Sequence, residues 1–231
     1  MKKNVLVLGA TGSIGCFIMN KFLDKGGCEG CNVIGTSRSE TNDDRMFQVT
    51  SENMEALGEC TDLDIVVWAQ GLNTNDNIHS FDDGVFEEMM KGNVEFVLKT
   101  LRYLLEKGCV REGAKMVVVS SVYQNVTRKN KLSYSITKSA LKGLIMNLGY
   151  DLATKNMLIN AVLPGVIDNE MTWKTLMEKE MKYIRDYTGF GRLVTLEDVW
   201  NTVWFLVNGN TGITGQSIVV DLGFTNLMSY S

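Results

Sequence analysis

The sequence contains a single histidine, His79, and a single proline, Pro164, among its 231 residues. A hydrolase built on a Ser-His-Asp or Cys-His arrangement would therefore have to use His79, and a histidine-rich metal site is excluded. His79 follows a polar run over residues 73–77, which predicts an exposed loop. We therefore expect neither a metal site nor a histidine-based hydrolase.

Long apolar stretches are also missing. No segment reaches the roughly 18 consecutive apolar residues of a membrane-spanning helix. The first apolar run, residues 5–8, is too short for the hydrophobic part of a signal peptide. We expect a cytoplasmic protein that does not associate with membranes.

Cysteine is scarce. The five cysteines are odd in number and too sparse for a secreted disulfide scaffold, so we expect free thiols in a reducing compartment. Cys28 and Cys31 have a metal-like spacing, but no second Cys or His pair completes a site, and we interpret them as turn residues.

The charge excludes another class of partner. The 23 Lys and Arg residues against 27 Asp and Glu residues give a net charge of −4, which is unsuited to nucleic-acid binding. The length fits one globular domain spanning residues 1–231, which needs no metal or disulfide to fold.

Short apolar runs alternate with helical patterns along the chain. The runs are too continuously apolar for half-exposed strands, and predict strands covered on both faces. Predicted strands are 5–8, 32–35, 46–49, 64–68, 115–119, 158–162 and 217–221. Helical patterns follow residue 13 and cover 89–107, 134–153, 173–187 and 196–207, whereas 36–45 predicts a loop. This order predicts an α/β, Rossmann-like, doubly wound parallel sheet of seven strands flanked by helices.

A glycine-rich turn separates the first predicted strand from the first helix. Gly9 permits the tight turn, Gly12 lets the backbone approach a pyrophosphate, and Gly15 lets the helix pack on the sheet. The helix N-terminus then offers free N–H groups to phosphates. We predict a dinucleotide site that also includes Thr11, Ser13 and Ile14.

The end of the second predicted strand bears on the choice of dinucleotide. A carboxylate there would favour NAD, but this chain has Ser37 and Arg38, and its first carboxylate is Glu40. A hydroxyl beside a guanidinium suits a phosphate. We therefore expect NADP in preference to NAD. The alternative, that Arg38 is only a solvated loop residue, is less favoured.

Tyr134 and Lys138 lie four residues apart on one predicted helix, so that the ammonium can lower the phenol pKa. Tyr103 and Lys107 have the same spacing, but their apolar context indicates packing. Only the first pair is preceded by a serine, Ser121, at the carboxyl end of a predicted strand.

In these residues the chain resembles the short-chain dehydrogenase/reductase family, in particular its single-domain members similar to 3-oxoacyl-carrier-protein reductases. The resemblance includes Asn93 and covers nearly the whole chain. It implies that Ser121 binds the substrate oxygen, Tyr134 transfers the proton, Lys138 lowers the tyrosine pKa and binds ribose, and Asn93 holds a relay water. It also implies dimers or tetramers, and we expect a homotetramer or homodimer.

Further matches and departures complete the predicted cofactor site. Pro164, Gly165 and Ile167 match the family segment beside nicotinamide, and Asn169 stands where the family has threonine. Residues 190–192 and 213–221 match the family's closing pattern. The family's Asn-Asn-Ala-Gly turn instead reads Trp68-Ala69-Gln70-Gly71, and its aspartate after the third strand is replaced by Gln48. The remaining predicted cofactor contact is Val49.

The substrate is less well indicated. Basic residues over 128–131 suit an anionic or carrier-linked carbonyl compound, or form an ordinary solvated loop. Residues 168–190 are predicted to form a small lid. Candidate substrate contacts are Gln70, Leu72, Tyr123, Gln124 and Met171.

The leading hypothesis is an NADP-dependent oxidoreductase that interconverts a carbonyl and a secondary alcohol. A sugar-nucleotide epimerase or dehydratase is an alternative, because Ser13 gives the glycine turn the spacing seen in such relatives. A catalytically silent dinucleotide-binding regulator is a second alternative. The complete set of four catalytic residue types argues against it.

Overall fold

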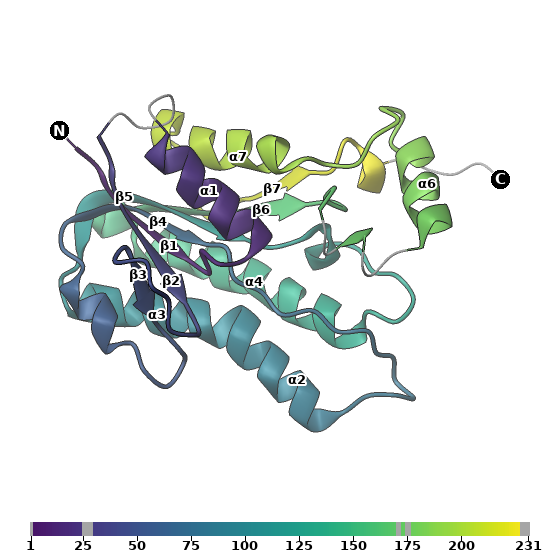
Figure 1. Ribbon diagram of the computed structural model, residues 1–231, viewed down its shortest axis with the longest axis horizontal. Coiled ribbons are helices and arrows are strands. Elements are labelled where there is room, and N and C mark those ends of the chain that lie inside the picture. Colours follow the sequence, from purple (N-terminus) through teal and green to yellow (C-terminus); the bar gives the residue numbers. More distant parts are fainter. Residues whose placement is uncertain (1, 25–29, 170–171, 174–176, 227–231) are drawn as a thin grey trace.

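The computed structural model describes residues 2–24, 30–169, 172–173 and 177–226. They contain a seven-stranded sheet in the order β3-β2-β1-β4-β5-β6-β7, with every pairing parallel (Figure 1). The strands are β1 (Asn4–Leu8), β2 (Asn32–Ser37), β3 (Met46–Gln48), β4 (Leu63–Trp68), β5 (Val110–Val119), β6 (Leu158–Pro164) and β7 (Ser217–Val220). The predicted doubly wound parallel sheet is confirmed.

Helices cover both faces of the sheet. On one face lie α1 (Ser13–Leu23) and α7 (Leu196–Trp204), and on the other α2 (Asp83–Met90), α3 (Phe96–Glu106) and α4 (Leu132–Asp151) (Figure 1). Each face has its own apolar core, and the central strands contribute to both. Burial on both faces explains why these strands are continuously apolar rather than alternating. A further helix, α6 (Glu178–Tyr187), lies toward the carboxyl ends of β6 and β7.

Short turns of other helix types connect these elements. Four are 3₁₀ turns, at Glu55–Glu59, Val122–Gln124, Ala153–Lys155 and Phe224–Asn226. Two are π turns, at Lys91–Glu95 and Phe205–Gly209. Residues 38–45 contain no helix, as predicted for the connection between β2 and β3.

The helix predicted over 89–107 was wrong in its start and continuity. It begins at Asp83, because the Asp82 carboxylate accepts the Val85 N–H at 2.8 Å and caps the helix. It is then interrupted by the π turn before α3 begins. Strand β5 also starts earlier than predicted, at Val110.

Three other expectations concern residues outside the sheet. His79 lies exposed in a turn, as predicted. Cys16, Cys60 and Cys109 are free, but Cys31 is disulfide-bonded, so the expectation of free thiols throughout was wrong. No described helix is long and apolar enough to cross a membrane, and the described residues contain no cluster of three metal-ligating side chains.

Candidate active site

A cavity of about 620 Å³ opens at the carboxyl edge of the sheet, where β1, β2 and β4 end. Ligands of open α/β sheets bind at this edge. Predicted residues lining it are Gly9, Thr11, Gly12, Ser13, Ile14, Ser37, Arg38, Val49, Ala69, Gln70, Gly71, Leu72, Tyr134 and Lys138. The structure therefore brings the glycine turn, the end of β2 and the Tyr134/Lys138 pair to one cavity.

The glycine turn owes its shape to close backbone contacts. Gly9 has φ of +78°, and a β-carbon there would lie 2.6 Å from the Gln70 nitrogen. A β-carbon at Gly15 would lie 2.2 Å from the Gly9 carbonyl oxygen. Neither position therefore accepts a side chain, and α1 can begin directly beneath the turn with its N-terminal N–H groups near the cavity.

The end of β2 presents a hydroxyl and a guanidinium. Ser37 is buried, and its Oγ accepts the Ser39 N–H at 3.1 Å. Arg38 is exposed at the cavity and forms no ion pair with another described residue. Gln48 does not line the cavity, and its side-chain amide instead donates to the Arg38 carbonyl at 3.2 Å.

Ser121 and Tyr134 meet above the end of β5. Ser121 caps the Val122–Gln124 turn by accepting the Tyr123 N–H at 3.3 Å. Tyr134 projects from the first turn of α4, close enough to Ser121 for that side chain to lower the pKa of its hydroxyl. Lys138 follows one turn later, with its Nζ 5.6 Å from the centre of the Tyr134 ring. The predicted constellation of Ser121, Tyr134 and Lys138 is thus assembled at one end of α4.

Burial dominates the electrostatics of this constellation. It raises the pKa of Tyr134 to about 12, while the nearby Ser121 side chain acts in the opposite direction and Tyr123 adds to the increase. Burial also lowers the pKa of Lys138 to about 8. Both changes follow from the cost of holding a charge away from water. Burial therefore moves the two pKa values apart and favours the neutral form of each side chain.

Asn93 lies in the π turn between α2 and α3, and its side-chain amide is hydrogen-bonded through both its oxygen and its nitrogen. Its Oδ1 accepts the Leu72 N–H at 2.7 Å, and its Nδ2 donates to the Leu72 carbonyl and to Thr137 Oγ1, each at 3.0 Å. The wider π turn directs this side chain inward from the helix. Asn93 thus connects the segment after β4 to α4, and does not itself line the cavity.

Two buried polar atoms on the cavity wall lack a hydrogen-bond partner among the described residues. They are Gln70 Oε1 and Ser120 Oγ. Buried polar groups are nearly always hydrogen-bonded, so unpaired ones at a cavity indicate where a polar ligand binds. Together with the side-chain-free glycine turn, they fit the hydroxyl and phosphate groups of a dinucleotide.

Several predicted residues lie outside the cavity wall. Pro164 ends β6, and Gly165 and Ile167 follow it. Asn169 donates to Ser13 Oγ at 3.1 Å, which joins this segment to the glycine turn. Gln124, a predicted substrate contact, is buried, does not line the cavity and donates to Ser217 Oγ at 2.7 Å. Met171 lies outside the described residues.

The basic segment 128–131 is divided by the fold. Arg128 and Lys129 are exposed, and Arg128 lies 3.9 Å from Glu180 of α6. Lys131 is instead buried beside Tyr134, so its placement in a solvated loop was wrong. The Tyr103/Lys107 pair packs away from the cavity, with the Tyr103 hydroxyl near the Glu55 carbonyl at 3.5 Å.

Sequence reasoning missed several residues of the cavity wall. Those it did not name are Thr36, Thr50, Ser51, Glu52, Asn73, Glu88, Lys91, Gly92, Phe96, Val119 and Ser120. Thr36, Thr50, Asn73, Gly92 and Ser120 directly precede or follow a predicted residue, so proximity in the chain was the available signal for these five. Glu88 lies near the end of α2, whose start had been placed too late, and Lys91 begins the π turn that follows it.

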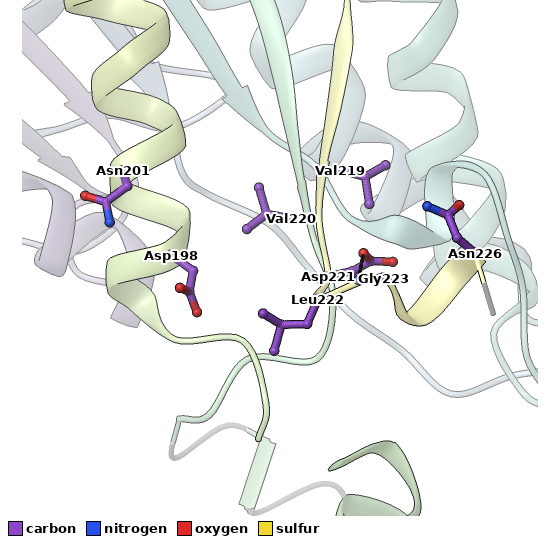
Figure 2. A pocket seen from close by; sticks show the side chains of 8 residues that line it. All are labelled: Asp198, Asn201, Val219, Val220, Asp221, Leu222, Gly223 and Asn226. Carbon is purple, nitrogen blue, oxygen red and sulfur yellow. Dashed lines mark hydrogen bonds between the residues drawn. The ribbon is translucent and has the colours of Figure 1, made fainter. Parts of the chain in front are cut away.

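A second cavity of about 430 Å³ lies between α7 and the end of β7 (Figure 2). Its two carboxylates already have partners. Asp198 pairs with Arg192 at 2.5 Å, and Asp221 accepts the N–H groups of Gly223 and Thr225 at 2.9 and 2.8 Å. These contacts assign both side chains to chain turns and helix capping.

Comparisons with known proteins agree with this architecture. A family model described as enoyl-(acyl carrier protein) reductase matches residues 39–225. The 3-oxoacyl-(acyl-carrier-protein) reductase FabG of Rickettsia felis is 28% identical over 236 residues, covering 96% of each chain. The aldohexose dehydrogenase of Thermoplasma acidophilum superposes with a TM-score of 0.85 at 22% identity, covering 100% of this chain and 96% of its own. ElxO, solved with NADP bound, gives 0.83 at 25% identity, covering 98% of this chain and 100% of its own.

The fold and the site define an α/β enzyme of the dehydrogenase and reductase class. Because the family model spans most of the chain, the protein belongs to the short-chain dehydrogenase/reductase family. The resemblance drawn from the sequence is confirmed.

Proposed function

We propose that this protein is an NADP(H)-dependent oxidoreductase that interconverts a carbonyl compound and a secondary alcohol, with Tyr134 as the acid and base. The observation that carries the proposal is the placement of Ser121 and the buried Lys138 around Tyr134, at one end of the cavity. The relatives support it, since FabG is named a 3-oxoacyl reductase.

Each residue of the constellation has a separate task. Ser121 donates a hydrogen bond to the substrate oxygen and holds it beside Tyr134. The Tyr134 hydroxyl gives its proton to that oxygen during reduction and recovers it during oxidation. The Lys138 ammonium stabilises the resulting phenolate and binds ribose hydroxyls. NADPH, when bound, supplies a hydride from C4 of its nicotinamide ring to the carbonyl carbon.

Asn93 acts by holding the wall of the site together. A β-carbon at Gly71 would lie 3.4 Å from Lys138 Nζ and 3.6 Å from Asn93 Oδ1, so the three residues converge. By joining Leu72 to Thr137, Asn93 fixes the segment after β4 against the helix that bears Tyr134. This contact fixes the position of the segment after β4, on the substrate side of the cavity, relative to the proposed proton donor Tyr134.

The preference for NADP rests on Ser37 and Arg38. Their hydroxyl and guanidinium border the cavity at the end of β2, where an adenosine 2′-phosphate binds in this fold. The bound NADP of ElxO supports this cofactor class. We place the remaining cofactor contacts on the glycine turn, on Val49 and Ala69 to Gly71, and on the segment from Pro164 to Asn169.

The substrate is proposed to be a small carbonyl compound, either anionic or attached to an acyl carrier protein. Exposed Arg128 and Lys129, and the Tyr123 ring 5.6 Å from the Tyr134 ring, lie on the side where it would enter. Residues 168–190, including α6, form the proposed lid.

Assembly and location complete the proposal. We propose a homodimer or homotetramer, since α3 and α4 expose the apolar side chains Leu98, Ile136, Met146 and Tyr150. Light scattering that reports a 25.8 kDa species would contradict it. We also propose a cytoplasmic location, which fractionation with a tagged chain tests.

The deciding experiment is an absorbance assay with NADPH and NADH against a panel of 3-oxoacyl thioesters, aldoses and simple ketones. We expect oxidation of NADPH with at least one carbonyl compound, and a chiral secondary alcohol as the product. A panel without turnover, together with tight binding of NADPH measured by fluorescence, would favour a silent binding protein instead.

A further inference from the structure

Lys131 is a buried lysine immediately before α4 and outside the Tyr134/Lys138 motif. Only 5% of its surface is exposed, whereas its neighbours Arg128 and Lys129 are exposed. Its Nζ donates to Asn73 Oδ1 at 2.6 Å and to the Thr74 carbonyl at 3.1 Å. Asn73 lines the cavity, so this hydrogen bond connects Lys131 to the site.

The Lys131 ammonium lies over the ring of Tyr134. Its Nζ is 5.3 Å from the ring centre, and Lys138 Nζ is 5.6 Å from the same centre. Both hydrogen-bond acceptors of Lys131 are neutral, and it forms no ion pair within 4 Å among the described residues. The aromatic ring is therefore part of what compensates the buried charge.

We propose that Lys131 is a positioning residue that stabilises the ionised form of Tyr134 and shares this task with Lys138. The proposal rests on the proposed function, in which Tyr134 is the acid and base. A phenolate spreads part of its negative charge over the ring, so a cation on the ring face stabilises it more than it stabilises the neutral phenol.

The surrounding charges support a protonated Lys131 at neutral pH. Burial is the main reason why the pKa of Lys131 is lowered to about 8. Arg128 contributes to this lowering, and Asp76 opposes it. Arg128 is itself balanced by Glu180 of α6 at 3.9 Å. The other titratable groups at the Tyr134 ring are Lys138 and, from the Val122–Gln124 turn, Tyr123. The second cation is thus present at neutral pH and lost as the pH rises above 8.

Direct titration of Tyr134 tests the proposal without using activity. The protein is produced with 3-fluorotyrosine, whose lower pKa keeps the titration below alkaline unfolding, and the Tyr134 signal is assigned by its absence in Tyr134→Phe. Lys131→Gln keeps a donor for Asn73 and Thr74 but removes the charge. Because Lys131 is charged only below about pH 8, we expect the substitution to lower the ionised fraction of Tyr134 roughly tenfold at pH 7 and to change it progressively less above pH 8. Lys131→Arg and the control Lys129→Met should keep the original value.

An ionised fraction of Tyr134 at pH 7 that is unchanged in Lys131→Gln would overturn the proposal. Lys131→Met, which keeps the aliphatic stem, provides the same comparison if the glutamine variant does not fold. The pH profile of alcohol oxidation supplies a second readout: the proposal requires its rising limb to move to higher pH, whereas an equal loss at every pH would show a purely structural role. Failure of the proposed function would give a different result, because the Tyr134→Phe variant would then keep full turnover.

Discussion

The carboxylate of Asp76 accepts the backbone N–H of Ser133 at 3.0 Å and also the Ser133 hydroxyl. Asp76 belongs to the loop after β4, and Ser133 directly precedes Tyr134 in the first turn of α4. A distant loop therefore caps the helix that bears the proposed acid, because Lys131 at the N-cap position offers no side-chain cap.

Asp76→Ala should weaken both folding and turnover. It leaves the buried N–H and hydroxyl of Ser133 unpaired, which we expect to cost about 2–3 kcal/mol in denaturant unfolding. The loosened start of α4 should lower kcat as well. Asp82→Ala is the matched control, since Asp82 caps exposed α2 in the same way. It should cost about 1 kcal/mol and leave kcat unchanged. Equal losses of kcat in the two variants would contradict this coupling.

Tyr134→Phe should remove the proton donor and little else. We expect kcat to fall by about 10²–10⁴, the usual contribution of a general acid or base. The dissociation constant for NADPH, followed by fluorescence, should change little. Tyr103→Phe removes the hydroxyl of the similarly spaced Tyr103/Lys107 pair and should retain full activity.

Lys138→Met should stabilise the protein while destroying its activity. Because burial lowers the pKa of Lys138 to about 8 from the ordinary 10.5, the native state binds its proton more weakly than the unfolded state. The cost of the buried ammonium is complete below pH 8 and disappears as pH rises to 10.5, since the unfolded state then holds more of the proton. Methionine should therefore stabilise by up to about 3 kcal/mol at pH 7 and progressively less above pH 8.

The control for this experiment is Lys107→Met, at an exposed position. Its free energy of unfolding should show no comparable dependence on pH. A stabilisation by Lys138→Met that stayed constant up to pH 10.5 would show that packing, not charge, is responsible.

Arg38→Ala should raise KM for NADPH by roughly tenfold to a hundredfold, which corresponds to one charge-assisted phosphate contact. KM for NADH should hardly change, because NADH lacks the 2′-phosphate. Arg45→Ala removes a nearby arginine that is already paired with Asp43 at 2.8 Å, and serves as the control. If Arg38→Ala changed KM equally for NADPH and NADH, Arg38 would not contact the 2′-phosphate.

The parts of this structure that were predictable are those encoded locally. Continuous apolar runs located all seven strands, and the glycine turn located the cavity. The burial of Lys131 was not predictable, because its acceptors Asn73 and Thr74 come from a loop far away in the sequence. The hydrogen bond of Gln124 was not predictable for the same reason, since its partner Ser217 lies in the last strand.

Trp68 illustrates how a departure from the family pattern is absorbed by the fold. It replaces the asparagine expected after β4, yet its fully buried indole N–H donates to Thr100 Oγ1 at 2.8 Å. The substitution therefore strengthens the core between β4 and α3 and adds no group to the cavity. The sequence would have indicated this hydrogen bond only if Trp68 and Thr100 had been considered together.

The arrangement of helices on the sheet has a consequence for how the enzyme can change. The chain leaves β1 toward α1 on one face and leaves β4 toward α2 on the other, so the two connections diverge. The opening between them is produced by the path of the backbone, and no side chain has to be removed to create it. Residues on its rim, such as Arg38 and Gln70, are therefore free to change with the substrate and cofactor while the scaffold beneath them stays intact.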